Sequence, residues 1–208
     1  MGAKTRKRRL LSPTFTEALV YAAELHAGQQ RKGAEPVPYV GHLMGVASMI
    51  LELGGSETLA IAALLHDAVE DQPQRGRTVE EIRERFGPDV LRIVLACTDS
   101  LAETDDRGAA TWRARKERYL QHVGSKRGDE LFVSLADKLH NVRKILADLR
   151  REGASVWERF SGKKDGTLWY YVSLVDAFHA ADLPPHAKEL LWEFEDTVRE
   201  IEEIARME

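Results

Sequence analysis

The 208-residue chain has one cysteine, Cys97, so it cannot form an internal disulfide bond. Cys97 follows the apolar stretch 90–96 and is predicted to be a small core residue rather than a reactive thiol. No apolar run reaches the roughly 18–20 residues that cross a membrane, and no signal-peptide core is present. These absences exclude a disulfide-bonded scaffold and a membrane-spanning protein, and they predict a cytoplasmic protein.

An excess of basic residues is also absent. The chain has 30 Lys and Arg residues against 34 Asp and Glu residues, a net charge of −4 that argues against general nucleic-acid binding. The N-terminus is a local exception, with Lys4, Arg6, Lys7, Arg8 and Arg9 close together. Residues 1–13 are predicted to form a solvated, disordered tail. A contact with RNA, an anionic lipid or an acidic partner is the alternative.

Period-two strands and internal repeats are lacking too, and apolar residues recur at helical spacing instead. With 43% hydrophobic and 31% charged residues, the composition suits a globular domain. We therefore predict an all-α protein, with residues 14–182 as the main domain and 183–208 as its C-terminal packing helix. The predicted helices are 14–27, 42–53, a segment around His66, 78–86, a segment from Pro88, 111–123, 130–150, 167–181 and 185–206.

Capping signals set several of these boundaries. Thr78-Val79-Glu80-Glu81 has the pattern of a capping box, which predicts the start of a helix that ends at Gly87. Pro88 then suits the first turn of the next helix. The polar residues 99–110 are predicted to form a loop.

Four chemically active side chains, His66, Asp67, Glu70 and Asp71, stand in the middle of an apolar helical run. Burying a carboxylate without a partner costs several kcal/mol, so such a group calls for a cation. On an uninterrupted helix, Glu70 lies about 40° from His66, Asp67 about 100° and Asp71 about 140°. All four share one face, which predicts a metal site. A buried structural pair at His66–Asp67, and ion pairs of Glu70 and Asp71 with buried basic residues, are the alternatives.

Two further residues are candidate ligands, because a divalent ion needs more than one helix supplies. His42 opens a helix directly after Pro38-Tyr39-Val40-Gly41, where a rigid turn could aim it. Asp137 is a carboxylate on an otherwise apolar helical face within residues 133–141.

These residues carry a resemblance to the HD-domain phosphohydrolases, whose pattern is H…HD…D. Over about residues 15–180 the chain resembles the hydrolase domain of the Rel/Spo-type alarmone enzymes. Its length is similar to that of the single-domain small alarmone hydrolases, including metazoan homologues. The matching segments stand in family order and are Gln30-Arg31-Lys32-Gly33, Pro38–His42, Ala63–Asp71, Phe86–Val90, Leu135–Arg143 and Thr167–Tyr171.

The resemblance implies an HD-domain helical bundle that holds one Mn²⁺ per chain. Its implied metal ligands are His42, His66, Asp67 and Asp137. Glu70 and Asp71 match the acidic pair that activates or orients the attacking water.

The implied reaction is the hydrolytic release of pyrophosphate from the ribose 3′ position of (p)ppGpp, giving GDP or GTP, in the stringent response. Arg31 and Lys32 match a basic pair beside the nucleotide, although adjacent basic residues in a loop are often only solvated. Asn141, one turn beyond Asp137, matches a residue that contacts the ribose.

Two other functions stay open: an HD phosphohydrolase for another nucleotide, such as an adenosine 3′-pyrophosphate, and a non-catalytic nucleotide sensor. The intact pair Glu70–Asp71 argues against the sensor.

His26 and His140 fall outside the ligand pattern and are predicted to be structural, and the aromatic segment 169–171 is predicted to be core or interface. Both a monomer and a homodimer are compatible with the sequence.

Overall fold

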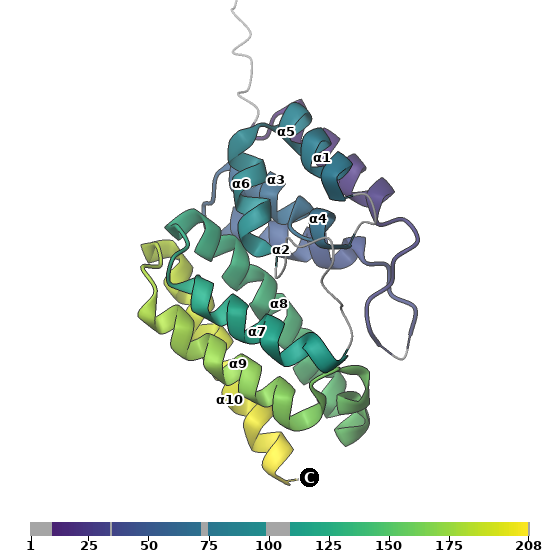
Figure 1. Cartoon of the computed structure of the whole chain (residues 1–208), viewed down its shortest axis with the longest axis vertical. Helices are drawn as coiled ribbons and strands as arrows, with labels where there is room; N and C mark the ends of the chain where they lie inside the picture. The colour runs from purple at the N-terminus through teal and green to yellow at the C-terminus, as the bar shows by residue number, and fades with distance from the viewer. Residues whose placement is uncertain (1–9, 34, 72–74, 99–108, 208) are drawn as a thin grey trace, which may run out of the picture.

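The computed structural model describes residues 10–33, 35–71, 75–98 and 109–207, and within these ranges the regular structure is helical (Figure 1). The prediction of an all-α protein is confirmed. The elements are α1 (Pro13–Leu25), α2 (Val40–Glu52), α3 (Glu57–Leu65), α4 (Ala68–Asp71), α5 (Arg75–Phe86), α6 (Pro88–Cys97), α7 (Ala109–Val123), α8 (Gly128–Glu152), η1 (Gly153–Arg159), α9 (Lys163–Ala180), η2 (Pro185–Ala187) and α10 (Lys188–Met207).

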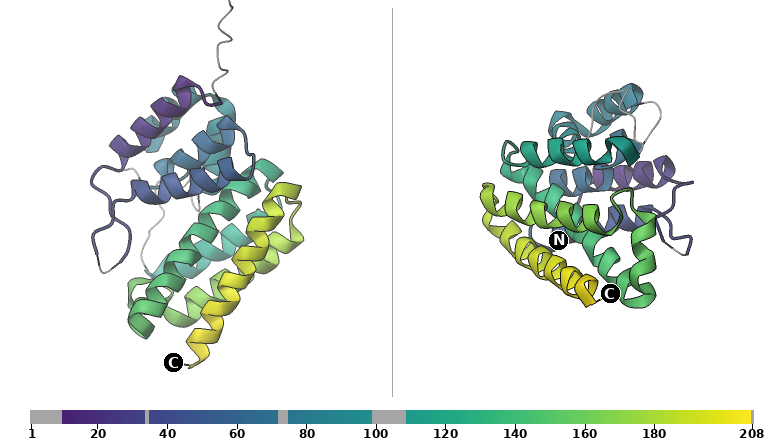
Figure 2. Two further views of the ribbon diagram at one scale, coloured as in Figure 1. Left: turned by 180° about the vertical axis from the view of Figure 1, so that it is seen from behind. Right: turned by 60° about the horizontal axis from the view of Figure 1, so that its bottom comes forward.

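Helix α8 is the central element of the bundle. It contacts α2, α3, α6, α10 and η1. Figure 1 shows α1 to α6 gathered at one end of the molecule and α7 to α10 at the other, and Figure 2 shows α10 running alongside α8. Because α8 is buried along most of its length, a polar side chain on it is held in place by packing from several helices.

The C-terminal helix α10 packs against α8 and α9. Its apolar stripe is buried through Leu190, Leu191, Phe194, Val198 and Ile201. This agrees with a packing helix of the same domain, while the boundary at residue 182 stays a prediction. In the part of the chain that the structure describes, no helix is long and apolar enough to cross a membrane.

Several helix boundaries follow the capping signals. Ser12 caps α1, because its Oγ accepts a hydrogen bond from the Thr14 amide at 3.1 Å. Gly87 separates α5 from α6 with a φ of 90°, a conformation that side chains with a Cβ rarely adopt, and Pro88 begins α6.

The predicted capping box at Thr78 is wrong. Helix α5 already begins at Arg75, and Thr78 is buried inside it. Glu81 does not cap the helix; its carboxylate accepts hydrogen bonds from Arg77 Nε and the Tyr21 hydroxyl, both at 2.8 Å.

The loop predicted over residues 99–110 ends earlier than expected, since α7 begins at Ala109. Residues 1–9 of the predicted tail and 99–108 of that loop lie outside the described residues.

The continuous helix predicted through His66 is also interrupted. Helix α3 ends at Leu65, a turn holds His66 and Asp67, and α4 begins at Ala68. The His66 side chain hydrogen-bonds the Ala63 carbonyl through Nδ1 at 2.8 Å. In an uninterrupted helix the same carbonyl would pair with the Asp67 amide, so the imidazole competes with the helical ladder at this point.

Candidate active site

Four predicted ligands, His42, His66, Asp67 and Asp137, converge inside the helical bundle. His42 lies in the first turn of α2, His66 and Asp67 form the turn between α3 and α4, and Asp137 lies in the middle of α8. Both histidines are almost fully buried, with 2% and 1% exposure, and the side chain of Asp67 is 19% exposed. Three separate elements therefore deliver the candidate ligands to one place.

The histidine Nε2 atoms face the two carboxylates. His42 Nε2 lies 3.2 Å from Asp137 Oδ1 and 3.6 Å from Asp67 Oδ2. His66 Nε2 lies 3.4 Å from Asp137 Oδ1 and 3.0 Å from Asp67 Oδ2. His42, His66 and Asp67 each offer a ligand atom within 4.8 Å of the other two. Asp137 falls outside that three-residue group, yet its Oδ1 is close to both imidazoles.

The hydrogen bonds of these histidines leave Nε2 for a ligand. The Ala63 carbonyl can only accept a hydrogen bond, so His66 Nδ1 carries a proton, and in the neutral ring Nε2 presents the lone pair. Although the carboxylate oxygens are near, neither His42 Nε2 nor His66 Nε2 has a partner in hydrogen-bond geometry. Two buried nitrogens without a hydrogen bond, beside two carboxylates, form a donor set of the kind that suits a divalent ion.

The electrostatics of the cluster agree with cation binding. Burial alone would lower the pKa of His66, but Asp67 and Asp137 outweigh it and hold that pKa well above 6.5. Burial alone would raise the pKa values of the two carboxyl groups, yet both lie well below the usual value, because His66 stabilises ionised Asp67 and Lys138 stabilises ionised Asp137. The site thus favours positive charge between its carboxylates, supplied by a proton or by a metal ion.

Two supporting residues, Tyr39 and Lys138, were not singled out from the sequence. The Tyr39 hydroxyl donates to Asp67 Oδ2 at 2.6 Å, and Lys138 Nζ donates to Asp137 Oδ2 at 2.8 Å. Their closeness in sequence to the candidate ligands could have indicated them, since Tyr39 stands three residues before His42 and Lys138 follows Asp137 directly. The predicted structural role of His26 agrees with its stacking on the Tyr39 ring, at 5.3 Å between centroids.

His140 has a contact that sequence spacing did not indicate. Its Nδ1 lies 2.9 Å from His42 Nδ1. Burial, together with the nearby His42 and Arg31, lowers the pKa of His140 to about 4, so its ring is neutral at pH 7.

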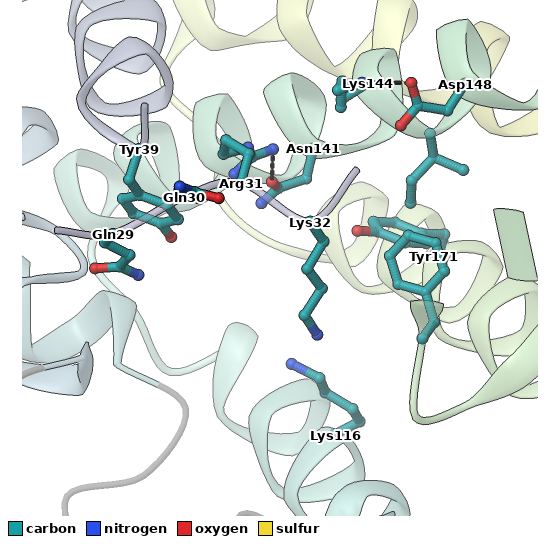
Figure 3. Close-up of a pocket in the computed structure, with 12 residues that line it drawn as sticks. Gln29, Gln30, Arg31, Lys32, Tyr39, Lys116, Asn141, Lys144, Asp148 and Tyr171 are labelled. Carbon is teal, nitrogen blue, oxygen red and sulfur yellow. Dashed lines mark hydrogen bonds and ion pairs between the residues drawn. The ribbon is translucent and has the colours of Figure 1, made fainter. Parts of the chain in front are cut away.

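The predicted substrate residues line a cleft beside this cluster. Its volume is about 350 Å³, and it is lined by Arg31, Lys32, Tyr39, Lys116, Asn141 and Lys144, among others. Asn141 donates through Nδ2 to Asp137 Oδ1 at 2.6 Å, and its Oδ1 accepts from Arg31 Nη2 at 2.8 Å. Figure 3 shows the side chains of Lys32 and Lys116 pointing toward one another. Two ammonium groups in that arrangement favour an anion between them.

A second cavity of about 370 Å³ shares Lys32 and Lys116 with this cleft and is lined by Glu70 and Arg115 as well. Glu70 therefore faces a strongly basic space. The backbone of Asp71 ends α4, but its side chain lies outside the described part of the structure. In the aromatic segment, Tyr170 is buried as predicted but also lines the second cavity, and Tyr171 lines both cavities.

Comparisons with known proteins agree with this geometry. The chain is 38% identical over 143 residues to guanosine-3′,5′-bis(diphosphate) 3′-pyrophosphohydrolase MESH1 of Xenopus tropicalis, covering 68% of this chain and 72% of that protein. The Drosophila melanogaster protein of the same name is 32% identical over 158 residues, 71% and 82% of the two chains.

A solved structure of a metazoan orthologue of SpoT, described as hydrolysing ppGpp, matches with a TM-score of 0.72 at 27% identity, over 91% of this chain and 96% of that one. The model of the HD domain family matches residues 18–168. The chain therefore belongs to the HD domain family.

Proposed function

We propose that this protein is a metal-dependent (p)ppGpp 3′-pyrophosphohydrolase, which releases pyrophosphate from the ribose 3′ position and leaves GDP or GTP. The observation that carries the proposal is the pair of buried Nε2 atoms of His42 and His66, which make no hydrogen bond and face the carboxylates of Asp67 and Asp137. This donor set adjoins a basic cleft of nucleotide size. The named activity of the similar MESH1 proteins supports the choice of substrate.

The four side chains fit one divalent ion per chain, and we propose Mn²⁺, since two imidazoles and two carboxylates form a mixed nitrogen and oxygen donor set. Such an ion, when bound, would lower the pKa of a water molecule and neutralise phosphate charge. Lys138 holds Oδ2 of Asp137, so this carboxylate keeps its Oδ1 toward the histidines. Tyr39 donates to Asp67 Oδ2, the same oxygen that lies near both imidazoles, and so fixes its position.

Glu70 is the proposed general base, with Asp71 as its partner in orienting the water. Glu70 lines the basic cavity, with Lys32, Arg115 and Lys116, where the phosphate groups would lie. It would take a proton from the attacking water as the water oxygen bonds to phosphorus and the bond from phosphorus to the ribose 3′ oxygen breaks. The same proton would then pass to the leaving 3′ oxygen, which becomes a hydroxyl, and Glu70 would return to its ionised form. Lys32 and Lys116 would neutralise the phosphates, and Arg31 and Asn141 would contact the nucleoside. As an alarmone hydrolase, the protein would act in the stringent response in the cytoplasm.

The proposal is tested with purified protein stripped of metal and resupplied with Mn²⁺, Mg²⁺ or Zn²⁺. The substrates are ppGpp, pppGpp, the adenosine analogue ppApp and ordinary nucleoside phosphates, and the products are separated by ion exchange. We expect Mn²⁺-dependent release of pyrophosphate, not orthophosphate, from ppGpp and pppGpp. Rapid turnover of the other nucleotides with (p)ppGpp left intact would overturn the substrate assignment, and metal and nucleotide binding without turnover of any substrate would favour the sensor.

The role of the acidic pair is tested separately with Asp71→Asn. We expect this variant to bind the metal as the wild type does and to lose turnover. Unchanged activity would remove Asp71 from the mechanism.

A further inference from the structure

We infer that His140, seated against Gly45, is a positioning residue that fixes the tautomer and orientation of the proposed ligand His42. This inference rests on the proposed metal site, and it concerns a residue outside the ligand pattern. The carrying contact is the approach of the two Nδ1 atoms to 2.9 Å, with ring centroids 4.8 Å apart.

The direction of this hydrogen bond follows from the surroundings of His42. Its Nε2 faces Asp67 and Asp137 and must present a lone pair there to bind a cation. A neutral imidazole then carries its proton on Nδ1, so His42 Nδ1–H donates and His140 Nδ1 accepts. The arrangement selects the ligand tautomer of His42 and fixes the plane of its ring.

The Nδ1 atom of His66 is also held by a hydrogen bond, but its acceptor is different. His66 Nδ1 donates to the backbone carbonyl of Ala63, within its own helical turn. His42 instead depends on a side chain of another helix, α8, that lies 98 residues away in sequence. Of the two candidate histidine ligands, His42 is therefore the one whose orientation a distant substitution can disturb.

Gly45 supplies the space that His140 needs. A Cβ at position 45 would lie 2.6 Å from His140 Cδ2 and nearer still to Nε2, a separation that requires the ring to move. Gly41 lies in the same helix, α2, and a Cβ there meets nothing within 4 Å. Since Gly45 is one turn after His42, helix α2 presents the ligand and the seat of its partner on one side.

The test uses two substitutions of His140 and two matched glycine substitutions. His140→Leu removes the acceptor and roughly keeps the volume, whereas His140→Asn can place an amide oxygen near the position of Nδ1. Gly45→Ala displaces the ring without removing it, and Gly41→Ala is the control in the same helix. The main measurement is the Mn²⁺ dissociation constant of the metal-stripped protein, by calorimetry, with circular dichroism and thermal unfolding to verify the fold.

We expect His140→Leu and Gly45→Ala to weaken Mn²⁺ binding by about 10- to 100-fold. His140→Asn should recover most of the affinity, and Gly41→Ala should bind as the wild type does. At saturating Mn²⁺, the KM of His140→Leu for ppGpp should be unchanged and its kcat largely restored, because the defect lies in holding His42.

Wild-type Mn²⁺ affinity in folded His140→Leu would overturn the inference. So would equal losses in the Leu and Asn variants, or equal effects of the two glycine substitutions. These affinities are measured without substrate, so the result stands even if the protein does not hydrolyse (p)ppGpp. If Mn²⁺ fails to bind the wild-type protein at all, the proposed metal site and this inference fall together, whatever the substrate.

Discussion

Replacing Asp137 by asparagine separates the structural role of this residue from its proposed role in metal binding. The substitution keeps the shape of the side chain and removes its charge. In the metal-free protein, Lys138 then loses a carboxylate at 2.8 Å, and both partners are largely buried, with side-chain exposures of 7% and 10%. Breaking a buried ion pair costs about 3–5 kcal/mol, and the amide oxygen still accepts a hydrogen bond. We expect the free energy of unfolding to fall by about 3 kcal/mol, the lower end of that range.

The second consequence of Asp137→Asn concerns the metal. An ion that binds only the folded state stabilises it by about 2.7 kcal/mol at 100 times its dissociation constant. For a chain of 208 residues, this corresponds to a rise in Tm of about 5–11 °C. We expect the wild type to show this rise with Mn²⁺ and the Asp137→Asn variant to lose most of it.

Urea unfolding of the metal-free proteins and thermal unfolding with and without Mn²⁺ measure the two effects. Asp129→Asn is the matched control, since Asp129 also lies on α8 and pairs with Arg92, at a more exposed position remote from the cluster. This control should lose about 1 kcal/mol or less and keep the full Mn²⁺ shift. A Mn²⁺ shift in Asp137→Asn equal to that of the wild type would refute the placement of Asp137 in the metal site.

Three further predictions address the base, the cleft and a distant tyrosine. Glu70→Gln should keep the Mn²⁺-dependent rise in Tm and lower kcat by about 10²–10⁴-fold. The same change at the exposed Glu80 should leave kcat unaltered. A kcat of Glu70→Gln equal to that of the wild type in steady-state assays would exclude Glu70 as the base. Lys116→Ala should raise the KM for ppGpp by about 10-fold with a weaker dependence on salt, and an unchanged KM at low salt would place the phosphates elsewhere. Burial and the nearby Glu81 raise the pKa of Tyr21 to about 12, so the stability that its neutral form provides is complete below pH 10 and lost as the pH rises toward 12. Tyr21→Phe should remove one tyrosinate titration near pH 12 from the absorbance at 295 nm. A titration identical to that of the wild type would contradict this pKa.

The sequence predicted the helical class and most helix positions, because apolar spacing and the Gly87–Pro88 junction act locally. It did not predict the contacts that orient the candidate ligands. The hydrogen bond from Tyr39 to Asp67 and that between His42 and His140 join residues 28 and 98 positions apart. Such pairs depend on how α2 packs against neighbouring helices, which periodicity within one helix cannot specify.

The turn at His66–Asp67 shows how a local error can leave a site prediction intact. The apolar pattern runs without interruption from α3 into α4, so periodicity alone predicted one helix with four functional residues on a common face. The break instead separates His66 and Asp67, which occupy the turn beside the other candidate ligands, from Glu70, which lines the basic cavity. A turn of this kind lets neighbouring residues in the sequence face two different spaces, the cluster of candidate ligands and the cavity that Lys32, Arg115 and Lys116 line. The motif predicted the residue types of the site. The separation of Glu70 from His66 and Asp67 instead depends on the hydrogen bond of His66 with Ala63, which competes with the helix that the motif otherwise favours.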